Sequence, residues 1–126
     1  MSQTDQKTTT VCAIVPILRV PDVVSTVRFY VDKLGFGEEW TWGDPPYYAG
    51  ASIDGNKLHF IQSKEIPAAG SDASYLMVVG IDAYYDRLQQ SGVQIVQPLG
   101  LRPYGLRDFA IHDLNGYKVS IGEAAE

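Results

Sequence analysis

One order of secondary structure occurs twice along this chain of 126 residues, and it constrains the fold more than any other feature. In the first half, an apolar stretch at 11–20 precedes an amphipathic helix, and three short strands follow that helix. The second half repeats this order, starting from a strand at 75–80. Such an internal repeat indicates two similar modules. Neither half has enough apolar residues for a core of its own, so we expect two sheets that close around a shared concave surface.

The helix of the first half, within 18–36, has clear start and stop signals. Asp22 is expected to cap the first turn, and Gly35 ends the helix where a positive φ is needed. The apolar stretch at 11–20 before it is typical of a strand covered on both faces. Spacings of three and four residues predict one buried helical face, made of Val24, Val27, Val31 and Leu34.

Three strands follow this helix in the prediction. The first, 36–42, is rich in aromatic residues and ends at the turn Gly43-Asp44-Pro45-Pro46, which cannot continue a strand. The other two, 47–53 and 57–61, flank Asp54-Gly55, which is a strong hairpin signal. The segment 63–74 is predicted to be a linker.

The second half contains a helix that Asp82 is expected to cap and Gly92 to end. Its predicted buried face consists of Ile81, Tyr84, Tyr85 and Leu88. The remaining predicted elements are a strand at 93–96, a loop at 98–105 rich in proline and glycine, and a hairpin formed by 107–112 and 117–121.

The expected organisation is one α+β domain at 11–126, with modules at 11–62 and 75–123. Residues 1–10 are polar and lack the apolar core of a signal peptide, so we expect a disordered tail. Cys12 is the only cysteine, and its apolar surroundings favour a small buried side chain over a nucleophile. A chain that cannot form an internal disulfide is typical of the cytoplasm.

The net charge and hydropathy of the chain limit its partners. Fifteen acidic and ten basic residues give a formal net charge of −5, which argues against nucleic acid as a partner. No apolar run approaches the length needed to cross a membrane. The acidic balance mildly favours cationic partners.

Several motifs resemble the vicinal-oxygen-chelate superfamily of glyoxalases, bleomycin resistance proteins and extradiol dioxygenases. They are Leu18-Arg19-Val20-Pro21-Asp22, Phe29-Tyr30, Lys33-Leu34-Gly35-Phe36 and Asp113-Leu114-Asn115-Gly116-Tyr117-Lys118. The resemblance implies two βαβββ modules with a cup-shaped sheet. Three further segments are most similar to the bleomycin resistance branch: Tyr47-Tyr48-Ala49-Gly50, Lys57-Leu58-His59-Phe60 and Gly105-Leu106-Arg107-Asp108-Phe109-Ala110. Members of that branch are homodimers with clefts at the subunit interface, so the resemblance implies that this chain forms a homodimer and binds a small-molecule ligand.

The resemblance also implies where a metal would be bound in the enzymes of the superfamily. The matching positions in this chain are Val15, His59, Tyr75 or Leu76, and Ser120. Only His59 is a credible ligand, and protein metal sites normally need three or more donors. We therefore expect no metal, no cofactor and no catalytic residues. His112 and Glu123 remain as candidates for a rearranged metal site.

Alternation along the predicted hairpin gives a candidate binding face. With a two-residue turn at Asp54-Gly55, one face carries Tyr48, Gly50, Ser52, Lys57, His59 and Ile61, and the opposite face is apolar. Trp40 and Trp42 are expected side by side next to this face, with Glu38 and Asp44 nearby. Tryptophans and carboxylates suit a flat cationic ligand, although the tryptophans could instead cover the core or a dimer interface.

Two residues of the second module complete the candidate site. Tyr104 is expected to act as a lid, and Arg107 matches the motif arginine of the family, with an ion pair to Asp108 or a neighbour as the alternative. The predicted ligand-binding residues are thus Trp40, Trp42, Tyr48, His59, Tyr104 and Arg107.

The functional hypothesis is a non-catalytic protein that sequesters a bleomycin-type or similar antibiotic. The alternatives are a metal-dependent glyoxalase-like lyase or dioxygenase with a rearranged site around His59 and Glu123, and a role in sensing an unrelated small molecule.

Overall fold

The computed structural model describes residues 8–125 as two βαβββ modules, which confirms the predicted α+β class and repeat. The first module contains β1 (Ile17–Val20), α1 (Val23–Asp32), β2 (Gly37–Trp42), β3 (Tyr48–Ile53) and β4 (Asn56–Gln62). The second contains β5 (Asp72–Met77), α2 (Ile81–Gln90), β6 (Gln94–Leu101), β7 (Leu106–His112) and β8 (Lys118–Ala124). Strand β5 begins at Asp72, inside the segment 63–74 that the sequence assigns to the linker.

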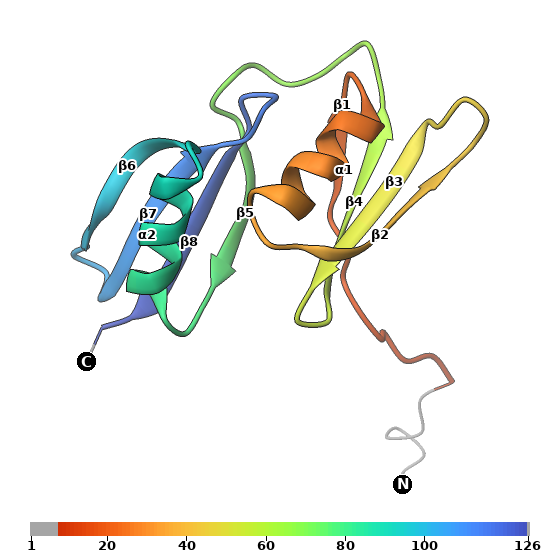
Figure 1. Cartoon of the computed structure of the whole chain (residues 1–126). Helices are drawn as coiled ribbons and strands as arrows, with labels where there is room; N and C mark the ends of the chain where they lie inside the picture. The colour runs from red at the N-terminus through yellow and green to blue at the C-terminus, as the bar shows by residue number, and fades with distance from the viewer. Residues whose placement is uncertain (1–7, 126) are drawn as a thin grey trace, which may run out of the picture.

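Each module forms its own four-stranded sheet with one helix across it (Figure 1). The strand orders are β1-β4-β3-β2 and β5-β8-β7-β6, so β1 and β5 occupy edges of separate sheets. Both strands run parallel to their only neighbours, β4 and β8. The expectation that the two sheets close around one concave surface is therefore wrong for the single chain. Each sheet instead has an inner face toward its helix and an outer face away from it.

Helix α1 begins and ends as predicted, and Val27 and Leu34 are buried as predicted, but the buried face of the helix is shifted. The side chain of Asp22 accepts a hydrogen bond from the Ser25 amide at 2.9 Å, and Gly35 has a φ of +86°. Val24, predicted to be buried, is 42% exposed. The buried face consists of Val23, Thr26, Val27 and Tyr30.

Strand β1 is shorter than predicted and buried on one face only. Leu18 and Val20 are buried, whereas Ile17 is exposed, so the expectation of a strand covered on both faces is wrong. Cys12 lies before the strand and is exposed, which corrects its expected burial. The predicted tail at 1–10 lies largely outside the described residues.

The start of α2 is capped from a distant strand. Gly80 occupies the N-cap position with a φ of 92° and contributes no side-chain bond. Oε1 of Glu123, on β8, accepts hydrogen bonds from the Gly80 and Ile81 amides at 3.2 and 2.9 Å. The predicted cap Asp82 instead forms an ion pair with Arg107. Glu123 therefore has the capping role, because free amides at a helix N-terminus favour a carboxylate.

Strand β6 continues through the segment predicted as a loop. It extends to Leu101 and includes Pro98 and Gly100. Its pairing with β7 has two register shifts, and it lies at the edge of the sheet. Proline is tolerated on edge strands and at bulges, where no ladder hydrogen bond is lost.

One continuous core joins the two modules. At their junction, Asp113 is buried and its carboxylate accepts hydrogen bonds from the Tyr30 hydroxyl at 2.7 Å and from the Asn115 and Tyr117 amides at 2.8 and 3.0 Å. The Tyr117 hydroxyl in turn donates to the carbonyl of Arg19 at 2.8 Å. These bonds hold the turn before β8 against the first module. Neither helix in residues 8–125 has the length and apolar character needed to cross a bilayer.

Candidate functional site

The outer face of the first sheet carries the side chains that alternation in the sequence predicts. Gly50 lies opposite His59, and the two-residue turn at Asp54-Gly55 pairs Ile53 with Asn56. On the inner face, Ala49, Ala51, Leu58 and Phe60 are buried in the core. Because neighbours along a strand point to opposite faces, Tyr48, Gly50 and His59 lie on the outer face.

Three aromatic rings form a cluster on this outer face. The indole of Trp40 lies nearly parallel to the ring of Tyr48, with centroids 5.9 Å apart, and edge-on to His59 at 5.1 Å. The Tyr48 hydroxyl and Nδ1 of His59 are hydrogen-bonded at 3.0 Å. Trp40 nevertheless stays 42% exposed. We call Trp40, Tyr48 and His59 the aromatic platform.

A glycine lets the platform lie flat against the sheet. Trp40 is paired with Gly50 across the β2–β3 ladder. A Cβ atom at Gly50 would lie 2.5 Å from Cζ2 of Trp40 and 2.6 Å from its Cε2. Real side chains do not approach so closely, so only glycine permits this position of the indole.

Polar groups border the platform on one side. A pocket of about 220 Å³ is lined by Glu38, Trp40, Ala51, Ser52, Lys57 and His59. The Ser52 hydroxyl donates to the carboxylate of Glu38. Glu38 has a positive φ and lies at the register shift of β2, between Gly37 and Trp40. The site therefore combines aromatic surface with one carboxylate and one ammonium group.

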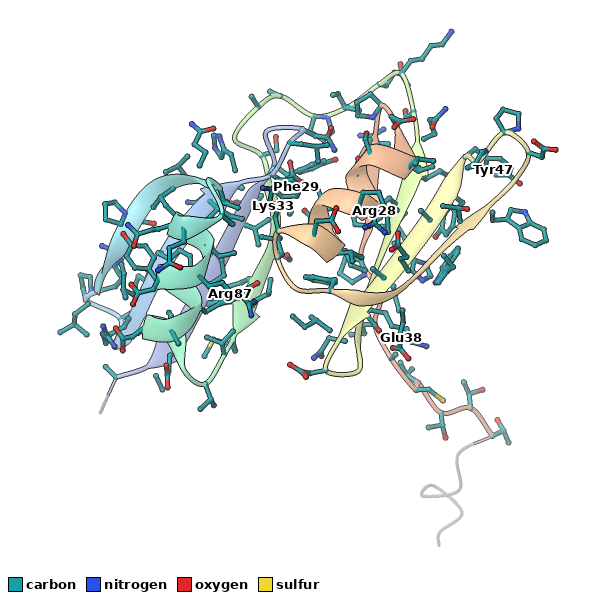
Figure 2. All side chains as sticks on the ribbon, in the orientation of Figure 1. Arg28, Phe29, Lys33, Glu38, Tyr47 and Arg87 are labelled. Atoms are coloured by element: carbon teal, nitrogen blue, oxygen red, sulfur yellow. The ribbon has the colours of Figure 1, made fainter. Side chains whose placement is uncertain are left out.

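Trp42 lies on the same face but further along β2. It is paired with Tyr48 and is 67% exposed. Figure 2 shows Tyr47 at the tip of the β2–β3 hairpin, whereas Glu38 lies toward the other end of β2. Trp42 thus lies at the rim of the platform, near the hairpin tip, where its side chain is open to a ligand.

The outer face of the second sheet carries a separate cluster centred on Asp108. This residue is only 3% exposed, and its Oδ2 accepts hydrogen bonds from the hydroxyls of Tyr75 and Tyr104 at 2.8 and 2.5 Å. Nε of Arg102 donates to its Oδ1 at 2.6 Å. We call Tyr75, Tyr104, Asp108 and Arg102 the tyrosine cluster. It includes Tyr104, the predicted lid.

The hydrogen bonds of the tyrosine cluster fix its protonation. Burial raises the pKa of Tyr75 to about 12, and the bond to Asp108 acts in the same direction. The bond to Asp108 also raises the pKa of Tyr104. Burial opposes the charge on Asp108, but the bonds from Tyr104, Arg102 and Tyr75 outweigh it and leave its pKa lowered. At neutral pH both phenols therefore keep their protons and the carboxylate is charged.

Arg107 lies on the opposite face of the second sheet. It alternates with Asp108 and shares the side of buried Phe109, toward α2. Its guanidinium binds the carboxylate of Asp82 through two hydrogen bonds of 2.8 and 3.1 Å. The structure thus brings Trp40, Tyr48 and His59 together, with Trp42 nearby, and places Arg107 away from both outer faces.

The side chains at the four positions that the resemblance implies for a metal do not form a metal site. His59 is bonded to Tyr48 through Nδ1 alone, so it could offer Nε2, but Val15 supplies no donor. Tyr75 lies opposite Ser120 on the outer face of the other sheet, and its hydroxyl is bonded to Asp108. Among residues 8–125, no three His, Cys, Asp or Glu side chains gather closely enough to hold a metal ion.

The rearranged metal site proposed from the sequence lacks support in the geometry. Glu123 faces α2 and caps that helix, whereas His59 is on the outer face of the first sheet. His112 lies at the end of β7, paired with Lys118 on one side and Gln94 on the other.

Sequence reasoning did not identify the tyrosine cluster, because its members come from three separate elements. Tyr75 is on β5, Asp108 is on β7, and Arg102 and Tyr104 lie between β6 and β7. The repeat does contain one signal for it. Gly122 lies beneath Tyr75, where a Cβ atom would be 2.3 Å from the phenolic oxygen, just as Gly50 lies beneath Trp40.

Comparisons with known proteins agree with this fold. Residues 10–121 match the family model described as the Glyoxalase/Bleomycin resistance protein/Dioxygenase superfamily. No curated protein sequence matches the chain. TioX from Micromonospora sp. ML1 has a similar structure, with a TM-score of 0.76 and 23% identity over 89% of this chain and 98% of that one.

Two further solved structures are also similar. A glyoxalase-related enzyme from Clostridium phytofermentans has a TM-score of 0.78 and 21% identity, covering 94% of this chain and 99% of its own. The bleomycin-binding protein from bleomycin-producing Streptomyces verticillus, complexed with copper(II)-bleomycin, has a TM-score of 0.71 and 25% identity, covering 94% and 98%. The fold is thus shared by a glyoxalase-related enzyme and by a bleomycin-binding protein.

Proposed function

Because the chain belongs to the Glyoxalase/Bleomycin resistance protein/Dioxygenase superfamily, we propose that it is a non-catalytic protein that sequesters a bleomycin-type or similar flat, cationic antibiotic. The superfamily includes both enzymes and binding proteins, so the choice between these two classes has to be argued from the geometry of the site. The observation that carries the proposal is the aromatic platform, in which Trp40 is seated on Gly50 and 42% exposed on an open sheet face. A bleomycin-binding protein shares the fold at 25% identity.

Sequestration requires binding and no chemical step. A flat ring system would stack on the indole of Trp40, and a positive charge would gain from the ring faces and from the Glu38 carboxylate. A protein of this kind acts by mass action, because each bound drug molecule lowers the free concentration. We place this function in the cytoplasm, where an exposed single cysteine such as Cys12 stays reduced.

A tryptophan fluorescence titration with metal-free and copper(II)-loaded bleomycin tests the proposal. We expect saturable quenching at micromolar or lower concentrations. Trp40→Phe should weaken the affinity about tenfold, because a smaller ring loses part of the stacking surface. Trp42→Phe should have a smaller effect, since Trp42 lies at the rim of the platform.

Two results would count against sequestration alone. A flat titration with the wild-type protein would remove bleomycin as the ligand class. Stoichiometric, tightly bound metal in protein purified without chelator would favour the alternative of a metal-dependent lyase or dioxygenase.

Leu101→Phe is the control variant for the fluorescence titration and should leave the affinity for bleomycin unchanged, because this exposed side chain lies at the end of β6 in the other module.

The proposal includes a homodimer. The pocket beside the platform, about 220 Å³, is smaller than the usual 300 to 1,000 Å³ of ligand sites, so a second surface is needed to complete it. A larger groove of about 1140 Å³ lies between the modules and is lined in part by Ile14, Met77 and Val79. All three side chains are exposed. Exposed apolar side chains that gather in one groove are a feature of protein–protein interaction sites.

Sedimentation equilibrium tests the dimer. We expect the wild-type chain to sediment at twice its monomer mass at micromolar concentration, and Met77→Glu with Val79→Glu to sediment as a monomer. Leu101→Glu, which charges an exposed apolar residue outside this groove, should leave the dimer intact. A monomeric wild-type protein at the concentration of the fluorescence titration would contradict this part of the proposal.

A further inference from the structure

The tyrosine cluster has hydrogen-bonding capacity that the fold itself does not use. Each phenol donates its proton to Oδ2 of Asp108. Within residues 8–125, neither phenolic oxygen receives a hydrogen bond in return. A hydroxyl that has donated its proton still has lone pairs that accept. Tyr75 and Tyr104 are 43% and 63% exposed as whole residues, so their rings are open to a ligand on the outer face.

Arg102 does not compete for these acceptors. Its Nε binds Oδ1 of Asp108, and its Nη2 donates to the carbonyls of Pro98 and Asp108 at 2.5 and 2.9 Å. The guanidinium is therefore held against β6 and β7 and neutralises the buried carboxylate. A ligand at this site meets two phenols that already donate their protons to Asp108. The ligand must therefore supply the hydrogen-bond donors itself.

The arrangement of the two oxygens specifies the kind of donor. Because both hydroxyls bind the same carboxylate oxygen, the phenolic oxygens lie close together. Two N–H groups on one planar, forked cation match two neighbouring acceptors. The exposed phenol rings add attraction for positive charge.

The position of the cluster resembles that of the aromatic platform. In each module an aromatic side chain lies over a glycine of the neighbouring strand: Trp40 over Gly50, and Tyr75 over Gly122. At both glycines a Cβ atom would meet the ring closer than 3 Å. An aromatic ring over a glycine therefore presents an aromatic surface on both outer faces: an apolar indole on the first sheet and a phenol with its polar hydroxyl on the second.

We propose that Tyr75 and Tyr104 form a second subsite, which binds an amidinium or guanidinium group through their two phenolic oxygens. Asp108 and Arg102 act as positioning residues, since they orient the phenols and do not touch the ligand. The inference deepens the proposed function and rests on it for the view that the outer faces bind ligand. It assigns the cationic group of the ligand to the second sheet.

Benzamidine and benzamide are suitable probes, because they have the same shape but only benzamidine is a cation with two forked donor groups. The protein, labelled with ¹³C at the Cζ of its tyrosines, is titrated with each compound and followed by NMR. We expect the Tyr75 and Tyr104 signals to shift saturably with benzamidine and to respond at least tenfold more weakly to benzamide.

Variants then locate the binding. Tyr104→Phe keeps the ring and removes one acceptor, and it should raise the dissociation constant of benzamidine about tenfold. Tyr85→Phe is the matched control, because Tyr85 packs on Phe109 at the inner face of the same sheet. An affinity that is equal for the two compounds, or unchanged in both Tyr104→Phe and Tyr75→Phe, would overturn the inference.

The two proposals fail in distinguishable ways. If bleomycin quenches Trp40 but benzamidine leaves the tyrosine signals unmoved, only the second subsite is wrong. If benzamidine binds and bleomycin does not, the subsite stands and the antibiotic is the wrong ligand.

Discussion

Replacing Asp113 with alanine is expected to lower the free energy of unfolding by about 3–5 kcal/mol, because the buried carboxylate has three hydrogen-bond donors. The substitution leaves the Tyr30 hydroxyl and the Asn115 and Tyr117 amides without their acceptor. Because the site is buried, water cannot replace the carboxylate as the acceptor without a cost in free energy. Urea unfolding at one fixed protein concentration measures the change.

Two further variants show whether the hydrogen bonds account for this loss. Asp113→Asn keeps an acceptor for the two amides and should cost only about 1–2 kcal/mol. Asp32→Ala removes an exposed carboxylate that pairs with Arg28, and it should change stability by less than about 1 kcal/mol. If Asp113→Ala unfolds at the same urea concentration as Asp32→Ala, the junction does not hold the modules together as described.

Short-range chemistry made the first sheet predictable. Both Asp54 and Gly55 have positive φ, as a two-residue hairpin turn requires, and this turn fixes the register of β3 and β4. Once the register is fixed, alternation decides which side chains reach the outer face. The positions of Tyr48, Gly50 and His59 therefore follow from the sequence.

Long-range partners explain why the buried face of α1 was mispredicted. Periodicity counts apolar residues and so favoured Val24 over Thr26 and Tyr30. Thr26 and Tyr30 are buried because their hydroxyls bond to Asn115 and Asp113, more than 80 residues away. A pattern within one helix contains no information about such partners.

Long-range partners also explain why the cap of α2 and the tyrosine cluster were not predicted. Asp82 is a reasonable local cap, but Glu123 reaches the free amides from β8, and Arg107 takes Asp82 as its partner. Asp108 likewise gathers residues from β5 and from the β6–β7 connection. Local sequence signals identified single residues such as Tyr104, whereas the groups they join depend on how the second sheet is assembled.

Gly50→Val is expected to weaken the binding of metal-free bleomycin by about thirtyfold or more, a larger loss than for Trp40→Phe. The new side chain would occupy the space of the indole, because even a Cβ atom would lie 2.5 Å from Cζ2 of Trp40. Trp40 would have to leave its stacked position on Tyr48. The fluorescence titration measures the affinity, and the near-ultraviolet circular dichroism of the free protein reports the displaced indole.

Gly37→Ala is the matched control for this variant, because Gly37 is on the same sheet and a Cβ atom there would meet nothing within 4 Å. It should change neither the dichroism nor the affinity. Gly50→Val with altered dichroism but unchanged affinity would mean that bleomycin does not stack on Trp40. Unchanged dichroism would mean that the sheet adapts to the valine without moving the indole, and the role of Gly50 as the seat of the platform would be wrong.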